Sequence, residues 1–450
     1  MKRIAMVVSA TAVFTVIGST SAMAVPLPTP SYSPFPYSGA AAGSSSLVTG
    51  IRTTGTSDPD LVYISGVYKP TTGGTQGLVY TGSLSGSGTW TALNRPSTPN
   101  KTTTSTALYG PDNIGSTGLR VVGSYKTSQT AKLDHGVIVD APTGPTGTLT
   151  WTTLDATSLV TTGAHAWKPP AFITTLSQGM SGARVRAVQK ALIARGYSIP
   201  SITAGTSTLG VFGTQTRAAV IAYQKAHPSL GAPTGTVGAG LYKSITTDSL
   251  KNTIAHSTRG GLVVGNFDTT LIAGRAFVTN TTGSSWFEIT KAGAVSITAY
   301  GIWYNSPGQY TIAGGYFSPP VGTAKPVEHA YLVNYASATR TLSGWRSYDY
   351  GNRTSGDLIT HFDGITPDGN GGFNLTGDRV GVGALTRGEG FFANVGRTSS
   401  GAFKAATWKP VKYPSSVVTS GNSVYQQSVI GIYVMSGSTV VSPYIADFSR

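Results

Sequence analysis

Tryptophan recurs in one local context along this chain, and its spacing limits the possible folds more than any other feature. Five of the seven tryptophans lie in the short segments TWTAL, TWTTL, SWFEI, GWRSY and TWKPV, as Trp90, Trp151, Trp286, Trp345 and Trp408. The intervals are 61, 135, 59 and 63 residues, and removing residues 172–246 shortens the long one to 60. The chain therefore contains a repeat with a period near 60, interrupted once by a segment of 75 residues.

Each repeat carries further strand-like runs before its tryptophan. One apolar run surrounds a glycine in six places, Gly66, Gly123, Gly265, Gly314, Gly377 and Gly431. A second run follows it at Gly77, Gly136, Ala276, Ala330, Gly390 and Pro443, and a weaker run such as SLVTGI precedes it. Four short strands per unit at a fixed period predict an all-β chain, a β-propeller of six blades. A β-sandwich or a solenoid built from the same strands is the alternative.

The two ends of the chain are predicted to share one blade. The sixth repeat stops at Arg450 without a tryptophan strand, and residues 34–37 (PFPY) near the N-terminus could supply it. Such closure removes an open sheet edge. The predicted propeller then consists of residues 25–171, with about two blades and the closing strand, and residues 247–450. The repeats loosely resemble the short extracellular repeats of some bacterial secreted proteins.

Residues 172–246 differ in character and are predicted to form a small all-α domain of three helices, inserted after the second blade. In residues 182–197, Val185, Val188 and Leu192 follow helical spacing. Residues 214–227 form a second helical run, with Ala218, Ala219, Ile221, Ala222 and Tyr223 as candidate core positions and Pro228 at its end. A short third element extends from Val237 to Ile245.

This segment resembles the peptidoglycan-binding-like domain that is attached to many bacterial cell-wall hydrolases. The resemblance rests on an ordered set of residues, among them Leu176, Gly179, Gly182, Val185, Val188, Gln189, Leu192, Gly196, Tyr197, Gly210, Phe212, Gly213, Thr216, Ala219, Val220, Tyr223, Gln224, the run 234–238 and Leu241. The chain departs from the family at Leu209, where an acidic residue is usual. The resemblance implies binding to peptidoglycan or a related wall polymer, without catalysis.

Charge supports an anionic ligand for this segment independently of the resemblance. It holds seven basic residues, Arg184, Arg186, Lys190, Arg195, Arg217, Lys225 and Lys243, and no acidic residue. The turn into the second helix offers backbone N–H groups to an anion. We predict ligand contacts at Arg184, Gly213, Thr214, Thr216 and Arg217. The alternative is a solvated helical surface that only aids solubility.

The N-terminus predicts export. Lys2 and Arg3 precede an apolar stretch of 14 residues, Ile4 to Ile17, and Ala22-Met23-Ala24 resembles a signal-peptidase site. Residues 1–24 are therefore interpreted as a signal peptide of a secreted protein, and no later segment is apolar enough to span a bilayer. The remaining chain carries 30 basic and 17 acidic residues. Its predicted partner is peptidoglycan or another anionic wall polymer, and not nucleic acid.

Signs of an enzyme are few. Cysteine is absent, and neither HExxH nor GxSxG occurs, so we predict no metal and no cofactor. The weak catalytic candidates are His361 and Asp363, which lie on one face of a strand, and Glu328. Glu328-His329 occupies the same repeat position as Asp134-His135, with Glu389 close to it, and this recurrence favours a structural role. Asp363 and Asp368 could instead bind calcium.

The sequence thus favours a secreted, non-catalytic wall-binding scaffold. Two alternatives remain. One is a wall-directed hydrolase, either a glycosidase or a peptidoglycan hydrolase, with its active site on the propeller. The other is a ligand-sensing propeller. A pocket on the propeller axis that is lined by two carboxylates, or by a histidine–carboxylate pair, would distinguish the hydrolase from the scaffold.

Overall fold

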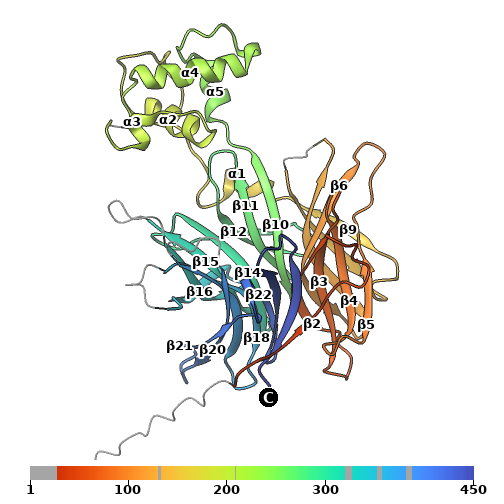
Figure 1. The fold of residues 1–450 in the computed structure, drawn as a ribbon. Coiled ribbons are helices and arrows are strands. Elements are labelled where there is room, and N and C mark those ends of the chain that lie inside the picture. Colours follow the sequence, from red (N-terminus) through yellow and green to blue (C-terminus); the bar gives the residue numbers. More distant parts are fainter. Residues whose placement is uncertain are drawn as a thin grey trace, which may run out of the picture.

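Strands in groups of four make up most of the molecule. The computed structural model describes residues 28–129, 133–207, 209–319, 327–351, 357–381 and 388–449. Each group forms a four-stranded antiparallel sheet, and the six innermost strands contact one another in cyclic order around one axis (Figure 1). The fold is therefore a six-bladed β-propeller, as the repeat predicted, and neither a sandwich nor a solenoid.

The first three blades follow one another in the sequence, each running from the axis outwards. Blade 1 consists of β2 (Ser45–Thr53), β3 (Leu61–Lys69), β4 (Gln76–Ser83) and β5 (Gly88–Ala92). Blade 2 consists of β6 (Thr103–Ile114), β7 (Gly118–Thr127), β8 (His135–Ala141) and β9 (Thr150–Leu154). Blade 3 consists of β10 (Leu250–Arg259), β11 (Leu262–Thr269), β12 (Arg275–Asn280) and β13 (Trp286–Ile289).

The last three blades include the one that joins the two ends of the chain. Blade 4 consists of β14 (Ser296–Ser306), β15 (Gln309–Ser318), β16 (Val327–Ala336) and β17 (Thr341–Tyr348). Blade 5 consists of β18 (Asp357–Pro367), β19 (Phe373–Gly381), β20 (Glu389–Arg397) and β21 (Phe403–Val411). Blade 6 consists of β22 (Ser416–Tyr425), β23 (Ser428–Met435), β24 (Ser442–Asp447) and β1 (Ser31–Pro34).

The closing strand lies three residues earlier than the sequence suggested. β1 pairs with β24 from Ser31 opposite Asp447 to Pro34 opposite Tyr444, and the Phe35 N–H donates to the Pro443 oxygen. The expected segment 34–37 therefore overlaps the strand only at Pro34. Phe35 instead packs its ring against Tyr80 of blade 1, with ring centroids 4.9 Å apart. The N-terminal segment thus completes blade 6 and contacts blade 1.

The repeated glycines are required by close approach of the two inner strands. In every blade the glycine of the second strand pairs with a residue of the innermost strand that directly precedes a β-bulge. A Cβ at these glycines would lie 1.8–2.4 Å from a carbonyl oxygen of the innermost strand, namely that of Leu47, Ala107, Ile254, Thr298, His361 or Ser420. No side chain fits at that distance, so the bulge and the glycine form one structural unit.

The helices lie between β9 and β10, mostly in a group set apart from the blades (Figure 1). The short α1 (Thr157–Thr162), for which the sequence carries no clear helical pattern, contacts blade 3. The three predicted helices are α2 (Ala183–Ala194), α4 (Thr214–Ala226) and α5 (Ala239–Thr246). A four-residue α3 (Pro200–Thr203) and a 3₁₀ turn (Pro228–Leu230) accompany them.

A separate apolar core holds this helical part together. It contains Val185, Val188 and Leu192 from α2, with Val220 and Tyr223 from α4, all 2% exposed or less. The candidate core was partly wrong, because Ala218 and Ala222 face solvent and Ile221 is only half-buried. The buried face of α4 is therefore narrower than its run of small apolar residues suggested.

The two ends of the helical part lie close together, because residues 169–172 and 246–248 line one hollow. The Tyr242 hydroxyl donates to the Pro170 oxygen at 2.7 Å, and Arg195 Nη2 donates to the Thr247 oxygen at 2.6 Å. The proposed boundaries 172 and 246 stay predictions, as do the signal peptide 1–24 and the start at Val25, which lie outside the described residues. Among the helices of the described residues, none has the length and apolarity needed to cross a membrane.

Candidate functional site

A β-bulge occurs at the same position in the innermost strand of every blade. The register shifts fall between Val48 and Gly50, Leu108 and Gly110, Ala255 and Ser257, Ala299 and Gly301, Phe362 and Gly364, and Gly421 and Ser423. The extra residues are Thr49, Tyr109, His256, Tyr300, Asp363 and Asn422. Because a bulge redirects a side chain, each blade contributes one polar or aromatic residue at the axis.

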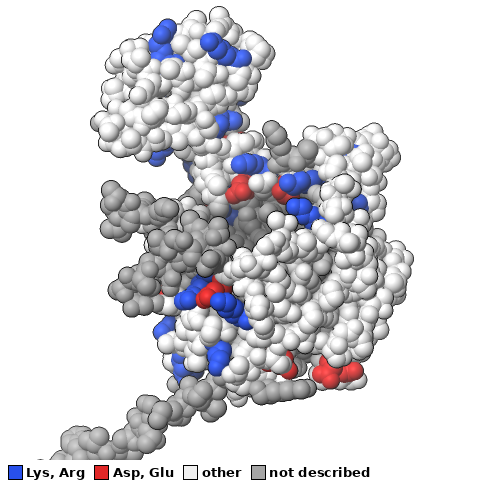
Figure 2. Space-filling view, viewed as in Figure 1, with Lys and Arg blue, Asp and Glu red and all other residues white. Residues whose placement is uncertain are grey.

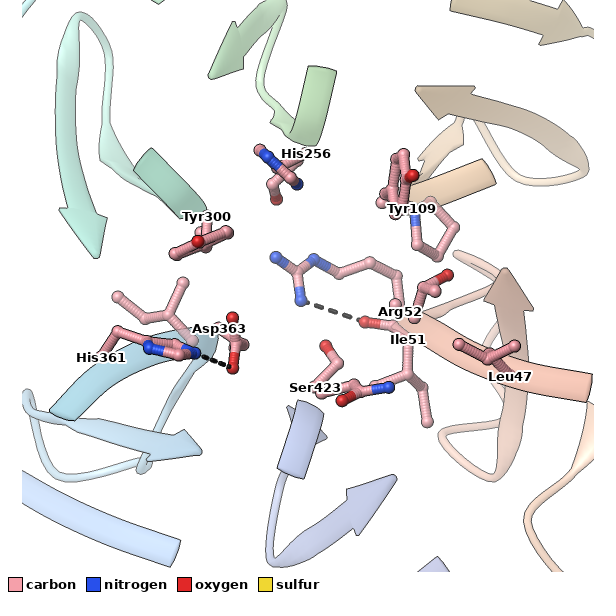
Figure 3. A pocket seen from close by; sticks show the side chains of 18 of the residues that line it. Leu47, Ile51, Arg52, Tyr109, His256, Tyr300, His361, Asp363 and Ser423 are labelled. Carbon is pink, nitrogen blue, oxygen red and sulfur yellow. Dashed lines mark hydrogen bonds and ion pairs between the residues drawn. The ribbon is translucent and has the colours of Figure 1, made fainter. Parts of the chain in front are cut away.

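These six residues line a cavity of about 280 Å³ on the propeller axis. Figure 3 shows side chains from the different blades pointing into this axial cavity. Six bulges with different side chains give an asymmetric cavity inside a nearly symmetric scaffold. The fold supplies the positions, and the individual residues supply the chemistry.

His361 is held between two carboxylates at one side of the axial cavity. Its Nε2 lies 3.2 Å from Asp363 Oδ2, and its Nδ1 lies 3.3 Å from Glu328 Oε2. Glu328 comes from β16 of the neighbouring blade and reaches His361 beside Gly315, where a Cβ would lie 2.4 Å from Glu328 Oε1. The structure thus brings all three weak catalytic candidates together.

Asp378 on β19 completes this group. Its Oδ1 accepts a hydrogen bond of 2.9 Å from the Gly421 N–H. Burial and the nearby Asp363 carboxylate raise the pKa of Asp378 to about 7. Burial also raises the pKa of Asp363, whereas the Asp363 and Glu328 carboxylates outweigh burial and raise the pKa of His361 well above its ordinary value. The group can therefore exchange protons near neutral pH.

Three of these side chains could also hold a cation. One ligand atom from each of His361, Asp363 and Asp378 lies within 4.8 Å of the other two. The expected calcium partner Asp368 is engaged elsewhere, because its Oδ1 accepts hydrogen bonds from the N–H groups of Asn370 and Gly372 in a turn. The absence of a metal stays a prediction, and the donor set alone does not select one.

An arc of aromatic rings forms the wall between blades 2 and 5. Tyr109 and His256 have ring centroids 5.4 Å apart, His256 and Tyr300 4.8 Å, and Tyr300 and His361 5.4 Å. Burial lowers the pKa of His256 to about 4 and raises that of Tyr300 to about 12, so both are neutral at pH 7. His256 Nε2 contacts Asn266 Oδ1 at 2.6 Å. The His256 and Tyr300 rings of the arc are thus neutral surfaces with polar edges, next to the His361 ring at its end.

Arg52 brings a positive charge into the same space. It lies on β2 three residues after the bulge at Thr49, and Figure 3 shows its guanidinium reaching towards the middle of the axial cavity. Burial, together with the charge of Arg259, lowers the pKa of Arg52 to about 10, so the group is charged at neutral pH.

The recurrent acid–histidine positions show why only one of them belongs to the site. His135 and His329 stack on Tyr125 and Tyr316 in the same way, at 5.0 and 4.8 Å between ring centroids. Asp134, however, lies 3.3 Å from Lys126 Nζ. Glu389, in blade 5, pairs with Arg379 instead. The acid–histidine pair therefore recurs because the blade structure repeats. Of the three acids Asp134, Glu328 and Glu389, only Glu328 contacts a histidine of the axial cavity, His361.

The predicted ligand residues of the helical part occupy several environments. Thr216 is buried and its Oγ1 accepts a hydrogen bond from Gln189 Nε2 at 2.9 Å. Gly213 directly precedes α4 and Thr214 begins it. Arg184 Nε donates to the Ala171 oxygen at 2.6 Å, and Arg217 Nη2 to the Thr234 oxygen at 3.2 Å.

Sequence reasoning missed Asp378, Arg52 and the aromatic arc. Each bulge residue is followed by glycine or serine, as in SLVTGI, TAYGI and FDGI. Aligning the weak first runs of the six repeats on that small residue would have identified the whole ring. Asp378 and Arg52 follow from the same alignment, because both have fixed offsets from the bulge or the repeated glycine.

Comparisons with solved structures give distant similarities over nearly the whole chain. A Dyadobacter fermentans protein of unknown function has 8% identity and a TM-score of 0.44, covering 94% of this chain and 100% of its own. A Penicillium chrysogenum alpha-L-arabinanase has 11% identity, a TM-score of 0.39 and coverages of 94% and 98%. The Ruminococcus gnavus intramolecular trans-sialidase has 8% identity and a TM-score of 0.38, covering 89% of this chain and 94% of its own. Similarities this low carry no argument about activity.

The helical part matches a sequence family. No curated protein matches the chain. Residues 181–245, which comprise α2, α4 and nearly all of α5, match the family model described as a putative peptidoglycan binding domain. The resemblance predicted from residues 172–246 is thereby confirmed: this part of the chain is similar to peptidoglycan-binding domains, and it interrupts a six-bladed propeller.

Proposed function

We propose that this is a secreted protein that binds peptidoglycan or another anionic cell-wall polymer through its helical part. The family match of residues 181–245 carries the proposal. Seven basic residues and no acidic residue in 172–246 agree with an anionic polymer. Arg186, Lys190, Arg217, Lys225 and Lys243 are exposed. Figure 2 shows Lys and Arg side chains on the visible face of this part.

The predicted contact region is the start of α4 with the cations around it. Thr214 begins this helix of 13 residues directly after Gly213, and the free N–H groups at the start of the helix attract anions. Arg217 is exposed one turn further on, whereas Arg184 is half-buried and also ties α2 to Ala171. We propose Arg217 as the better test residue, because replacing Arg184 also disturbs the connection to the propeller.

Pull-down on purified cell walls tests this proposal. The double variant Arg186→Gln/Arg217→Gln should bind several-fold more weakly than the unmodified protein at low salt, and salt should weaken both. The matched control, Lys69→Gln/Lys101→Gln, removes two exposed charges from the propeller and should bind normally. Equal binding by all three proteins at every salt concentration contradicts the proposal.

The axial cavity favours a second candidate function, a wall-directed hydrolase. In this second function the propeller is catalytic, whereas in the first it only carries the wall-binding helical part. The observation behind it is the cavity with His361 between Asp363 and Glu328, which is the feature that separates the two alternatives. Asp378, with a pKa of about 7, could act as the general acid, and Asp363 as the second carboxylate. Their oxygens lie within 4.8 Å, close to the roughly 5–5.5 Å of retaining glycosidases.

Release of reducing ends from purified walls or wall glycans tests the second candidate. The unmodified protein should release sugar ends, and Asp363→Asn or Asp378→Asn should each lower the rate by at least about 100-fold. Asp58→Asn, at an exposed loop position, is the control. Wall binding without any release would leave the scaffold function and exclude hydrolysis of that substrate.

A further inference from the structure

Arg52 is a buried cation without an anionic partner. Only 5% of it is exposed. Its Nη1 donates to the Ile51 oxygen at 3.0 Å and its Nη2 to the Ile302 oxygen at 3.3 Å, whereas its buried Nε has no partner. Within the described part of the chain, Arg52 makes no ion pair. Asp112, whose charge acts on it, pairs with Arg259.

The two carbonyl contacts position the guanidinium firmly. They come from blade 1 and from the opposite blade 4, and the Trp303 ring lies 5.2 Å below the guanidinium carbon. A buried charge that lacks a counter-ion is costly. A guanidinium fits a carboxylate because its N–H groups match the two oxygens. The unused Nε–H therefore indicates a ligand carboxylate.

The remaining walls require a different chemistry in the same ligand. Asp363 and Asp378 line the axial cavity with carboxyl groups, which can form hydrogen bonds with the hydroxyl groups of a ligand. Tyr109, His256 and Tyr300 present ring surfaces suited to the C–H faces of a small ring. The volume of about 280 Å³ is just below the roughly 300–1,000 Å³ of pockets for drug-sized ligands, so one ring-sized group fits.

We propose that the axial cavity binds a sugar acid, a hydroxylated carboxylate of monosaccharide size, with its carboxylate on Arg52 and its hydroxyl groups on Asp363 and Asp378. The inference rests on the cavity that the second candidate function uses, but it needs neither turnover nor wall binding by the helical part. Two sources share this chemistry: the hexuronic acids of acidic polysaccharides, and the lactyl-bearing muramic acid of peptidoglycan.

Ligand titration of the full chain, followed by calorimetry or ligand-observed NMR, tests the proposal. The probes are glucuronate and galacturonate with glucose and galactose as neutral counterparts, and N-acetylmuramate with N-acetylglucosamine. We expect at least one acid to bind at least 10-fold more tightly than its counterpart. Which acid binds identifies the source. No acid binding, or equal binding of acids and counterparts, overturns the proposal.

Variants at Arg52 locate the binding. Arg52→Leu should weaken the acid about 10–100-fold, as expected for a charged hydrogen bond, and remove its advantage over the neutral sugar. Arg52→Lys keeps the charge but loses the fork, and should bind several-fold more weakly while melting like the unmodified protein. If Arg52→Leu does not fold, Arg52→Lys alone tests the assignment. Arg95→Leu is the control, because Arg95 packs on Tyr125 of blade 2 and does not line the axial cavity. Undiminished acid binding in both Arg52 variants overturns the assignment.

A second set of variants separates this inference from the hydrolase function. Asp363→Asn should weaken acid and neutral sugars alike, because its contacts are with hydroxyl groups. Binding that persists without any released product supports the sugar-acid site and contradicts hydrolysis. Product release from neutral glycans, with no preference for sugar acids in binding, supports hydrolysis and contradicts the sugar-acid site.

Discussion

The surroundings of Asp378 destabilise the ionised form of its carboxyl group. Its folded pKa of about 7 lies above the unfolded value of roughly 3.9. The stability from its protonated form is therefore complete below the unfolded pKa and is lost as pH rises through the folded pKa. Asp378→Asn cannot ionise but still accepts the Gly421 hydrogen bond.

Denaturant unfolding at pH 4 and pH 8 measures this effect. Between these values, the free energy of unfolding of Asp378→Asn should rise by about 1–3 kcal/mol relative to the unmodified protein. Asp58→Asn reports the effect of removing an exposed carboxylate. A constant difference between Asp378→Asn and the unmodified protein across the pH range would show that Asp378 is ionised normally.

At the scale of the strands, the bulge and the repeated glycine are the main structural device. A Cβ at position 123 would lie 2.0 Å from the Ala107 oxygen, so Gly123→Ala must displace one of the inner strands of blade 2. We expect a loss of at least about 2 kcal/mol in the free energy of unfolding. Gly240→Ala, in α5 with nothing within 4 Å of its Cβ, should change it by less than about 0.5 kcal/mol. Similar losses in both variants would refute the close-approach argument.

The strands were predictable because their signals are local and repeated. Tryptophan spacing gave the period, and six glycine runs gave the number of blades. The closing strand was predicted three residues too late, because PFPY is the more apolar run. The residues that pair with β24 are Ser31–Pro34. The helix α1 carries little periodicity in six residues, and its position depends on blade 3, where Arg275 Nη2 donates to the Leu159 oxygen at 2.9 Å.

The candidate site was only partly predictable because its members come from different blades. His361 and Asp363 are two residues apart, so strand alternation alone brought them together. Glu328 lies 33 residues away and reaches His361 only because residue 315 is a glycine. Arg52 has a fixed offset from the bulge at Thr49, but only the circular closure of the ring brings it within reach of Ile302 in the opposite blade 4.

At the scale of the molecule, the helical part and the propeller have separate cores. The helical core consists of residues between 176 and 245, with Leu271 as a propeller side chain at its edge. The connection that leads into it is anchored outside 172–246: His165 Nδ1 lies 3.0 Å from Glu288 Oε1, and Arg275 binds the same carboxylate at 2.8 Å. Deleting the helical part leaves this anchor in place.

Deletion of residues 172–246 should therefore leave a folded propeller. Pro170, Ala171, Thr247 and Asp248 line one hollow, so the flanking ends lie close enough for a short Gly/Ser linker. The shortened protein should lose the helical contribution to its circular dichroism spectrum, keep the β-sheet signal, and melt cooperatively within a few degrees of the full chain. It should also lose wall binding while retaining any ligand binding in the axial cavity, since every residue that lines that cavity lies in the blades. A shortened protein that is unfolded would show that the helical part is needed to hold the ring together.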